Sequence, residues 1–508
     1  MSEKVNQDTI NKALWSACDT FRGTISADTY KDFVLTMLFL KYISDVWQDH
    51  YDEYAKEHGD EPDLIEALME TERFKLPKEA SFQSLYQHRH EPGNGERIDQ
   101  ALHAIEEANG NKLRDVGKSV FQDITFNTDK LGEEKQKNTI LRHLLEDFAK
   151  PELDLRPSRV GTLDVIGNAY EYMIKLFAAS GGQKAGEFYT PPEVSELIAE
   201  LLDPQQGDTI CDPACGSGSL LMKIGRKIRD HHDSKQYALY GQEAIGSTWS
   251  LAKMNMFLHG EDNHKIEWGD TIRNPKLLDK NGDLHHFDIV AANPPFSLDK
   301  WGHEDAANDP FDRFRRGVPP KSKGDYAFIL HMIETLKPGS GRMAVVVPHG
   351  VLFRGSSEGK IRQQLIEENL LDAVIGLPEK LFYGTGIPAA ILVFKKQRQA
   401  DDKVLFIDAS REFKAGKNQN LLDEDNIQKI LATYRDRSVV DKYSYLATKA
   451  EIAENDYNLN IPRYVDTFAE EAEIDLMDIR EKRKILKRQL ADLETEMDKH
   501  LKELGYGA

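Results

Sequence analysis

The chain has 508 residues, of which 40% are hydrophobic and 30% are charged, a composition typical of a soluble globular protein with two or three domains. Its 66 Lys and Arg residues stand against 86 Asp and Glu residues, which gives a formal net charge of -20. A protein that binds nucleic acid alone usually has a basic surface, so this balance argues against unaided DNA binding.

The chain also lacks the signals of export and of membrane insertion. It has three cysteines, an odd and small number that excludes a disulfide framework and favours a reducing compartment. The N-terminus is polar, and the apolar stretch at residues 33–43 is too short to span a bilayer. We therefore expect a cytoplasmic protein that does not contact a membrane.

Residues 1–150 are predicted to form an N-terminal helical domain. Val34, Met37 and Leu38 recur at helical spacing, and no alternating strand pattern persists in this region. No cluster of side chains here suggests catalysis, so we assign it to packing and partner contact. Residues 151–183 are predicted to form a connecting segment with one further helix at residues 163–177, which ends at a Ser-Gly-Gly sequence.

Residues 184–465 are predicted to form a catalytic domain of the α/β class. Amphipathic helices, for example at residues 192–202 and 247–258, alternate with short apolar runs that indicate buried strands. These runs are residues 209–212, 238–241, 265–268, 287–292, 343–347, 371–375 and 389–394. Such alternation favours a mainly parallel sheet covered on both faces, with the last of these strands antiparallel because its link is short. After residue 401 the pattern weakens, and we assign no further elements.

The tail at residues 466–508 is predicted to form a coiled-coil helix. Its seam consists of two interleaved seven-residue series, of which seven of nine positions are apolar: Leu476, Arg483, Leu490, Met497 and Leu504, and Ile479, Leu486, Leu493 and His500. A single helix with such a seam needs another helix to cover it, so the tail is expected to bind a partner.

The sequence Asn293-Pro294-Pro295-Phe296 follows a buried strand and is the strongest candidate for a catalytic site. The two prolines end the strand because they cannot donate ladder hydrogen bonds, and ligands bind at this carboxyl edge of open α/β sheets. An Asn oxygen and a proline carbonyl can accept the two N–H bonds of a planar amine, while the aromatic ring stacks on its plane. The alternative is a strand followed by a stiff turn without function.

Three further strand ends have the residues of a nucleoside site. A Gly-rich turn at residues 213–218 follows Asp212 and precedes a helix, but it has neither the G-x-G-x-x-G spacing nor the lysine of a phosphate-binding loop. Glu243 ends the next strand, where an acidic side chain can accept both ribose hydroxyls. Asp270 ends the third strand and could accept from an adenine amine. The alternative for both carboxylates is an ordinary surface position.

These features together resemble a known family. Asp212, Glu243, Asp270 and Asn293 at four strand ends resemble the Rossmann-like fold of S-adenosylmethionine-dependent methyltransferases, and Asn-Pro-Pro-Phe resembles the signature of enzymes that methylate exocyclic amines. The sequence Gly-Glu-Phe-Tyr-Thr-Pro at residues 186–191 is similar to that of adenine-N6 DNA methyltransferases. The runs at residues 251–256, 348–355 and 458–464 resemble the modification subunit of bacterial type I restriction–modification systems, and the resemblance covers nearly the whole chain.

The resemblance implies a role for each matched residue. S-adenosylmethionine would be the cofactor, with its ribose on Glu243 and its adenine at Asp270. Asn293 and the carbonyl of Pro294 would hold the target amine, Pro295 would complete the turn, and Phe296 would stack on the target base. The methionine end of the cofactor would lie against Glu187, Phe188, Tyr189, Thr190, Pro191, Pro192, Asp212, Gly216, Ser217, Gly218 and Ser219.

The chemistry that this arrangement implies needs neither a metal nor a covalent enzyme intermediate. A base inside a duplex cannot be reached, so the target adenine must be flipped out. The resemblance implies that the partners are double-stranded DNA, a specificity subunit, a second copy of this chain and, as a further candidate, a restriction or translocase subunit. Three alternatives stay open: an adenine-N6 methyltransferase that acts alone, an enzyme for RNA or a protein amide, and a structural subunit that binds cofactor without turnover.

The segment between Ser297 and Asp325 has little apolar pattern and five cationic side chains: Arg313, Arg315, Arg316, Lys321 and Lys323. Long loops of this kind are usually functional or disordered. Two interpretations stay open for the cations: contact with the DNA phosphate backbone, or simple solvation.

Overall fold

The structure, a computed structural model, describes residues 6–21, 23, 25–115, 118–161, 164–180, 189–382, 385–400, 402–416, 419–467 and 476–504. The chain forms two compact units, Met1–Val465 and Asp466–Ala508. Among the described residues, no helix is both long enough and apolar enough to cross a membrane.

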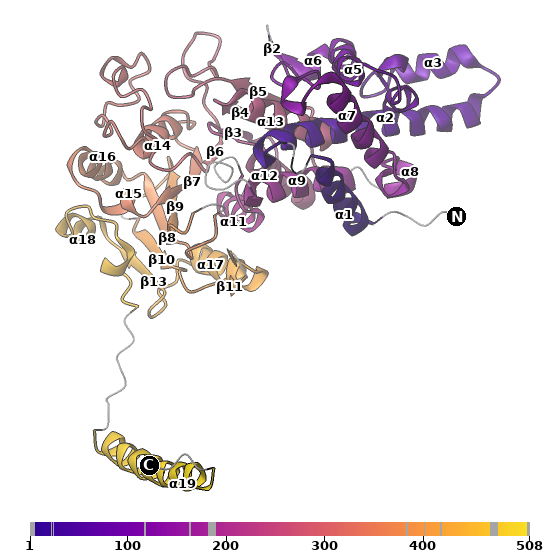
Figure 1. Cartoon of the computed structure of the whole chain (residues 1–508). Helices are drawn as coiled ribbons and strands as arrows, with labels where there is room; N and C mark the ends of the chain where they lie inside the picture. Colours follow the sequence, from indigo (N-terminus) through magenta and orange to yellow (C-terminus); the bar gives the residue numbers. More distant parts are fainter. Residues whose placement is uncertain are drawn as a thin grey trace. The chain divides into compact units, whose positions relative to one another are not determined.

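The first unit is built around one nine-stranded mixed sheet (Figure 1). The strands run in the order β13-β10-β8-β9-β7-β6-β3-β4-β5. Their bounds are β3 Thr209–Asp212, β4 Ala238–Glu243, β5 His264–Trp268, β6 Ile289–Ala292, β7 Arg342–Pro348, β8 Leu371–Gly376, β9 Ala389–Lys395, β10 Val404–Asp408 and β13 Ser444–Ala447. All seven predicted strands are present, and β9 pairs antiparallel with both β7 and β8, as its short link indicated.

Both faces of the sheet are buried. In β6, Ile289 and Ala291 pack into one hydrophobic cluster, whereas Val290 and Ala292 pack into the other. The first cluster is covered by α9 (Asp164–Ser180), α11 (Pro192–Leu202), α12 (Ser219–His232), α13 (Gly246–Leu258) and α17 (Glu424–Asp436). The second is covered by α14 (Asp325–Glu334), α15 (Gly350–Phe353), α16 (Ser356–Glu367) and α18 (Lys449–Glu454). The expected α/β architecture is confirmed.

Two strands of the sheet were not predicted. β10 lies parallel to β8, and β13 pairs antiparallel with β10 at the edge. The sequence at residues 458–464 closes this end of the unit, because the ring of Tyr464 stacks on Phe406 at 3.9 Å and Ile461 packs against Gly376. A short antiparallel pair, β11 (Lys414–Ala415) with β12 (Asn420–Leu421), lies outside the main sheet.

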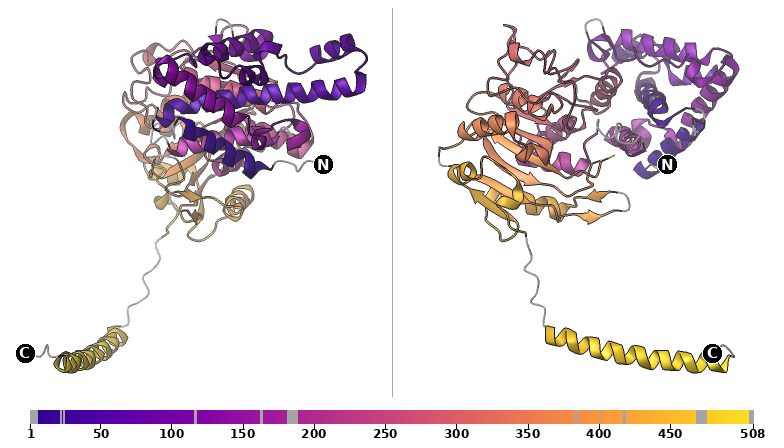
Figure 2. Two further views of the ribbon diagram at one scale, coloured as in Figure 1. Left: turned by 45° about the vertical axis from the view of Figure 1, so that its right-hand side comes forward. Right: turned by 60° about the vertical axis from the view of Figure 1, so that its left-hand side comes forward.

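In the described part of the N-terminal region, the elements are helices and one two-residue antiparallel ladder, β1 (Arg114–Asp115) with β2 (Lys118–Ser119). Its helices are α1 (Gln7–Ala17), α2 (Ala27–His58), α3 (Pro62–Glu70), α4 (Phe82–Gln87), α5 (Asn94–Ala108), α6 (Gly110–Leu113), α7 (Glu134–Phe148) and α8 (Pro157–Val160), with short 3-10 turns between several of them. The end of α2 and α3 project together as a hairpin (Figures 1 and 2).

The N-terminal helices share a hydrophobic core with the sheet layer. The ring of Phe257 in α13 meets Phe39 of α2 at 5.4 Å and Phe74 at 5.6 Å. Next to them, the guanidinium of Arg73 lies over the Phe257 ring and forms a salt bridge of 2.9 Å with Asp262. The boundary that we predict near residue 150 therefore separates two parts of one compact unit.

The second unit contains the helix α19, Leu476–Glu503, where the heptad pattern predicts it. Its large apolar side chains are exposed, including those of Leu486, Leu490, Leu493 and Met497. Leu486 and Leu490 line a shallow groove with Lys482, Arg483 and Lys487.

Candidate active site

The four residues predicted at strand ends lie along one edge of the sheet. Asn293, Asp212, Glu243 and Asp270 follow or end β6, β3, β4 and β5, which are neighbours in that order and parallel to one another. Since parallel strands present their carboxyl ends at the same edge, the topology brings the candidate catalytic residue and the candidate cofactor residues together.

The Gly-rich turn after β3 is shaped by glycine and held by α13. Gly216 and Gly218 have φ values of 54° and 79°, in the left-handed region that favours glycine. A Cβ on Gly218 would lie 2.7 Å from Cε of Met256. Asn255 donates a hydrogen bond of 3.0 Å to the carbonyl of Ser217, so residues 251–256 position this turn. The Ser217 and Ser219 hydroxyls lie 3.0 Å apart at the start of α12.

Glu243 is buried, and two main-chain groups fix its carboxylate. Its Oε2 accepts from the N–H of Gly216 at 3.0 Å, and its Oε1 accepts from the N–H of Ile245 at 2.8 Å. Burial raises the pKa of Glu243 above its usual value. Asp212 is also buried, and its Oδ1 accepts from the N–H of Ala214 at 2.9 Å. Burial, together with the charge of Glu243, raises the pKa of Asp212 to about 8.

Asp270 is only partly buried and shapes a turn. Its Oδ1 accepts from the N–H groups of Ile272 and Arg273, at 2.8 and 3.0 Å. Ile245, which sequence reasoning missed, lies two residues after the anchored Glu243 and is 59% exposed. Glu243 is the carboxylate that is predicted to bind the ribose. An exposed apolar side chain near it in the chain is suited to pack on a nucleoside base. No sequence motif marks Ile245, because its exposure depends on the fold.

Asn293 contacts the segment predicted to hold the cofactor. Its Nδ2 donates to Oγ1 of Thr190 at 3.3 Å, so Oδ1 is the end of the amide suited to accept from an amine. Tyr189 and Pro191 are buried, and Pro192 begins α11. Glu187 and Phe188, also predicted here, lie outside the described residues.

The ring of Phe296 is supported by a second aromatic ring. Phe382, in the loop between β8 and β9, meets Phe296 edge to face, with 5.9 Å between the centroids and 66° between the planes. Pro294 is buried and Pro295 half-buried. Sequence reasoning missed Phe382 because it lies 86 positions after Phe296 and no motif marks it.

Two of the five loop cations, Arg313 and Arg316, are buried, so neither DNA contact nor simple solvation describes them. Arg313 is buried and donates to Asp309 and to the carbonyls of Thr271 and Ile272, 3.1 and 2.7 Å away. Both Arg316 and Arg315 are paired with Glu334. These arginines therefore hold the loop together and tie it to the segment after β5. Asp309 lies only four positions from Arg313, but the sequence could not reveal the other pairs because Thr271, Ile272 and Glu334 are distant along the chain.

The sequence at residues 348–355 braces the segment after the Asn-Pro-Pro-Phe turn. The guanidinium of Arg354 binds Asp325 at 2.5 Å and also Glu358. Asp325 in turn accepts from the N–H of Ser297 at 2.8 Å. Residues distant in sequence thereby fix the backbone directly after Phe296.

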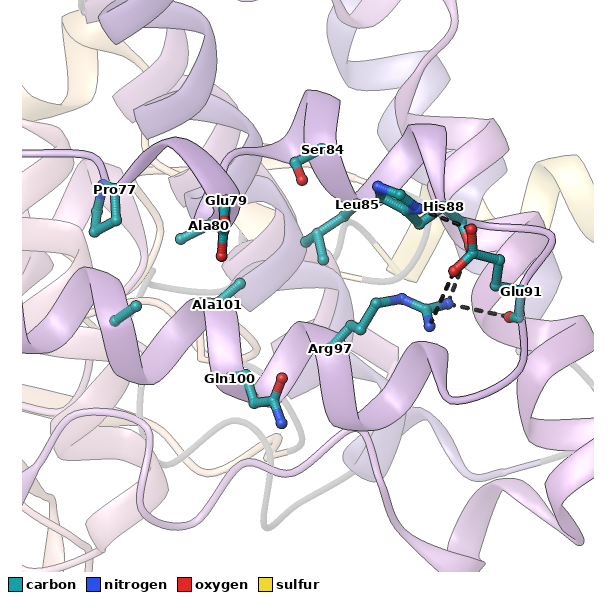
Figure 3. A pocket seen from close by; sticks show the side chains of 11 residues that line it. Pro77, Glu79, Ala80, Ser84, Leu85, His88, Glu91, Arg97, Gln100 and Ala101 are labelled. Atoms are coloured by element: carbon teal, nitrogen blue, oxygen red, sulfur yellow. Dashed lines mark hydrogen bonds and ion pairs between the residues drawn. The ribbon is translucent and has the colours of Figure 1, made fainter.

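A cavity of about 540 Å³ lies in the N-terminal helical region (Figure 3). Its central cation, Arg97, donates to the carbonyls of Pro92, His88 and Glu91 and to Oδ1 of Asn94. These contacts hold the loop before α5, which gives Arg97 a structural role.

Comparison with known sequences agrees with the site geometry. The profile of the N-6 DNA methylase family matches residues 161–473, and the profile of the HsdM N-terminal domain matches residues 10–148. The chain belongs to the N-6 DNA methylase family. The fold class and the type of enzyme that the sequence indicated, an adenine-N6 DNA methyltransferase, are thereby confirmed.

Relatives within this family match over nearly the full length. The methylase subunit of the type I restriction enzyme MpnII of Mycoplasma pneumoniae is 31% identical, and the match covers 95% of each chain. The HindI methylase subunit of Haemophilus influenzae is 34% identical over 82% of this chain and 93% of the relative. The crystal structure of a type I methyltransferase subunit from Streptococcus thermophilus superposes with a TM-score of 0.79, at 36% identity, and covers 91% of this chain. The N-6 DNA methylase described here is thus one of the type I methylase subunits.

Proposed function

We propose that this N-6 DNA methylase uses S-adenosylmethionine to methylate N6 of an adenine flipped out of double-stranded DNA, with sequence specificity supplied by a partner subunit. The contact between Asn293 and Thr190 carries the proposal, because it joins the residue expected to hold the target amine to the segment expected to hold the cofactor. Family membership supports the reaction type.

The residues at the sheet edge fit the proposed cofactor. Each carboxylate oxygen of Glu243 accepts one main-chain N–H and keeps a lone pair for a ribose hydroxyl. The absence of side chains at Gly216 and Gly218 lets a ligand approach the backbone of the turn. Asp212 would lie at the cationic methionine end. The cofactor would supply an electrophilic methyl group on a positively charged sulfur.

The target amine would be held by two acceptors. The lone pair of the adenine amine is delocalised into the ring, which makes the nitrogen a poor nucleophile. Asn293 Oδ1 and the carbonyl of Pro294 would accept its two hydrogens and return electron density to the nitrogen. Because Phe382 supports Phe296 from the edge, the stacking ring has a fixed plane before the base arrives, and such positioning contributes much of the rate.

Partner subunits would complete the enzyme. The exposed apolar seam of α19 fits a helix of the specificity subunit, and no target-recognition domain is evident in the described residues. The relatives are named as subunits of type I restriction enzymes, which favours assembly over an enzyme that acts alone. A second copy of this chain and a restriction or translocase subunit are further proposed partners.

The test is a methyl-transfer assay on the assembled complex. This chain, purified with its specificity subunit, is incubated with methyl-labelled S-adenosylmethionine and duplex DNA, and the DNA is then digested to nucleosides. We expect label in N6-methyl-2′-deoxyadenosine and far less transfer by this chain alone. Label in cytosine, RNA or protein, or full activity without a partner, would contradict the proposal.

A further inference from the structure

Two large apolar side chains stand exposed at the edge of the sheet that bears Asn293. Phe353 is 46% exposed and Ile387 is 51% exposed. In the short helix α15 the preceding residues, Val351 and Leu352, are fully buried, so the helix is firmly anchored while its last side chain faces outward.

The sheet register places the segments that carry both residues at strand ends next to β6, the strand that leads to the candidate target site. β6, which leads to Asn293, is parallel to β7, so both strands end at the same edge. β7 pairs antiparallel with β9, with Pro348 opposite Ala389, so β9 starts at this edge. Phe353, the last residue of α15, therefore follows the end of β7, and Ile387 precedes the start of β9.

Hydrogen bonds join the two segments. The N–H of His349 donates to the carbonyl of Pro388 at 3.4 Å, and its Nε2 lies 3.1 Å from the carbonyl of Ala389. The segment before β9 belongs to the same β8–β9 loop as Phe382, whose ring contacts that of Phe296. Phe353 and Ile387 thus lie on two joined connections at the sheet edge that also carries the candidate target site.

This apolar surface fits stacked bases better than a phosphate backbone. Flipping an adenine out of a duplex leaves a gap between the flat faces of its neighbours, and apolar side chains fill or widen such gaps in other DNA-binding proteins. We propose that Phe353 and Ile387 form an apolar wedge that enters the base stack beside the flipped adenine and keeps it out of the duplex. The inference rests on the proposed function.

The test compares two DNA substrates with the complete complex of this chain and its specificity subunit. In one duplex the target adenine is paired. In the other it lies opposite an abasic site, so less free energy is needed to flip it out. The variants are Phe353→Ser, Ile387→Ser and the double variant. Methylation of the paired duplex should fall about tenfold or more, as for the loss of a base-stacking contact, whereas methylation of the abasic duplex should stay within about twofold.

Matched variants separate the wedge from general effects. Val439→Ser removes a side chain that is 61% exposed next to the distant edge strand β13, and it should leave both substrates unaffected. Phe353→Leu keeps an apolar group and should retain most of the activity on paired DNA. Cofactor affinity, measured by calorimetry, should be unchanged in every variant.

Three results would overturn the wedge. They are equal activity of the serine variants and the parent on paired DNA, equal losses on both substrates, and failure of the variants to bind the specificity subunit, which would make this surface a protein interface. Failure of the parent complex to methylate adenine in either duplex would instead overturn the proposed function, and the wedge with it.

Discussion

The hydrogen bond from Asn293 to Thr190 joins residues 103 positions apart, and both are candidates that the sequence alone indicated. Asn293, Asp212 and Glu243 could be placed because each follows an apolar strand. Ile245 and Phe382 could not be predicted. Ile245 is notable for its exposure and Phe382 for its ring contact with Phe296, and both features arise only in the folded chain.

Replacing the amide of Asn293 tests the proposed acceptor. In Asn293→Ala, methyl transfer should fall at least a hundredfold, because loss of one preorganised hydrogen-bonding group costs about 3 kcal/mol of barrier. Cofactor binding, followed by calorimetry, should remain within a few-fold. Asn281→Ala, at an exposed loop asparagine, is the matched control. Transfer by Asn293→Ala close to that of the parent would sink the assignment.

The raised pKa of Asp212 predicts a pH dependence of stability. Burial raises this pKa to about 8 in the folded protein, against 3.8 for the ordinary group, so the folded state holds a proton that the unfolded state has lost. The contribution of Asp212 to the free energy of unfolding therefore decreases as pH rises from about 4 to about 8.

Asp212→Asn should remove this contribution. Without cofactor, the variant should gain at least about 1.4 kcal/mol relative to the parent between pH 5 and pH 8, the equivalent of one pKa unit. Urea denaturation of both proteins at the two pH values measures it. An equal pH dependence in parent and variant would show that the carboxyl does not hold its proton.

At the scale of elements, strands with clear flanking turns were predictable, and two others were not. β10 is a buried run from Val404 to Ile407 that follows β9 without an intervening helix, which hides the parallel βαβ pattern. β13 is a four-residue edge strand in a polar stretch. The bracing of residues 297–324 was also missed, because Arg313 and Arg316 use partners that only the fold brings near.

Removing α19 should separate assembly from folding. The cut belongs after Thr467, because Tyr464 and Val465 pack on the sheet. The truncated protein should unfold like the parent and bind cofactor, but it should neither co-purify with the specificity subunit nor methylate DNA.

Point variants of the helix refine this test. Serine at Leu486, Leu490 and Leu493 should weaken assembly by about 4 kcal/mol or more, roughly a thousandfold, since each leucine buried at an interface contributes 1.5–3 kcal/mol. Serine at Arg488 and Lys502, on the opposite heptad face, is the control. Normal assembly of the triple variant would place the docking surface on another part of the chain.

For the whole molecule, the shared core predicts cooperative unfolding of the helical region and the sheet. Phe257 packs against Phe39 and Phe74 of the N-terminal region, so Phe257→Ala should cost about 3–5 kcal/mol. Calorimetry should show one transition for residues 1–467, shifted as a whole in the variant. Phe413→Ala, at an exposed ring, is the control. Two separate transitions, with only one of them shifted, would mean that the regions fold independently.

Arg313, Arg315 and Arg316 form ion pairs with carboxylates of the same chain. This pairing affects how strongly the unassembled subunit binds chromosomal DNA. With three of the five loop cations paired to carboxylates, in a chain of net charge -20, this loop contributes less to displacing counterions from phosphates. The isolated subunit should therefore stay free of the chromosome at physiological ionic strength. Most of the salt dependence of DNA binding by the complex should originate in its partners, so a surplus of this subunit would not block the genome that the complex must search.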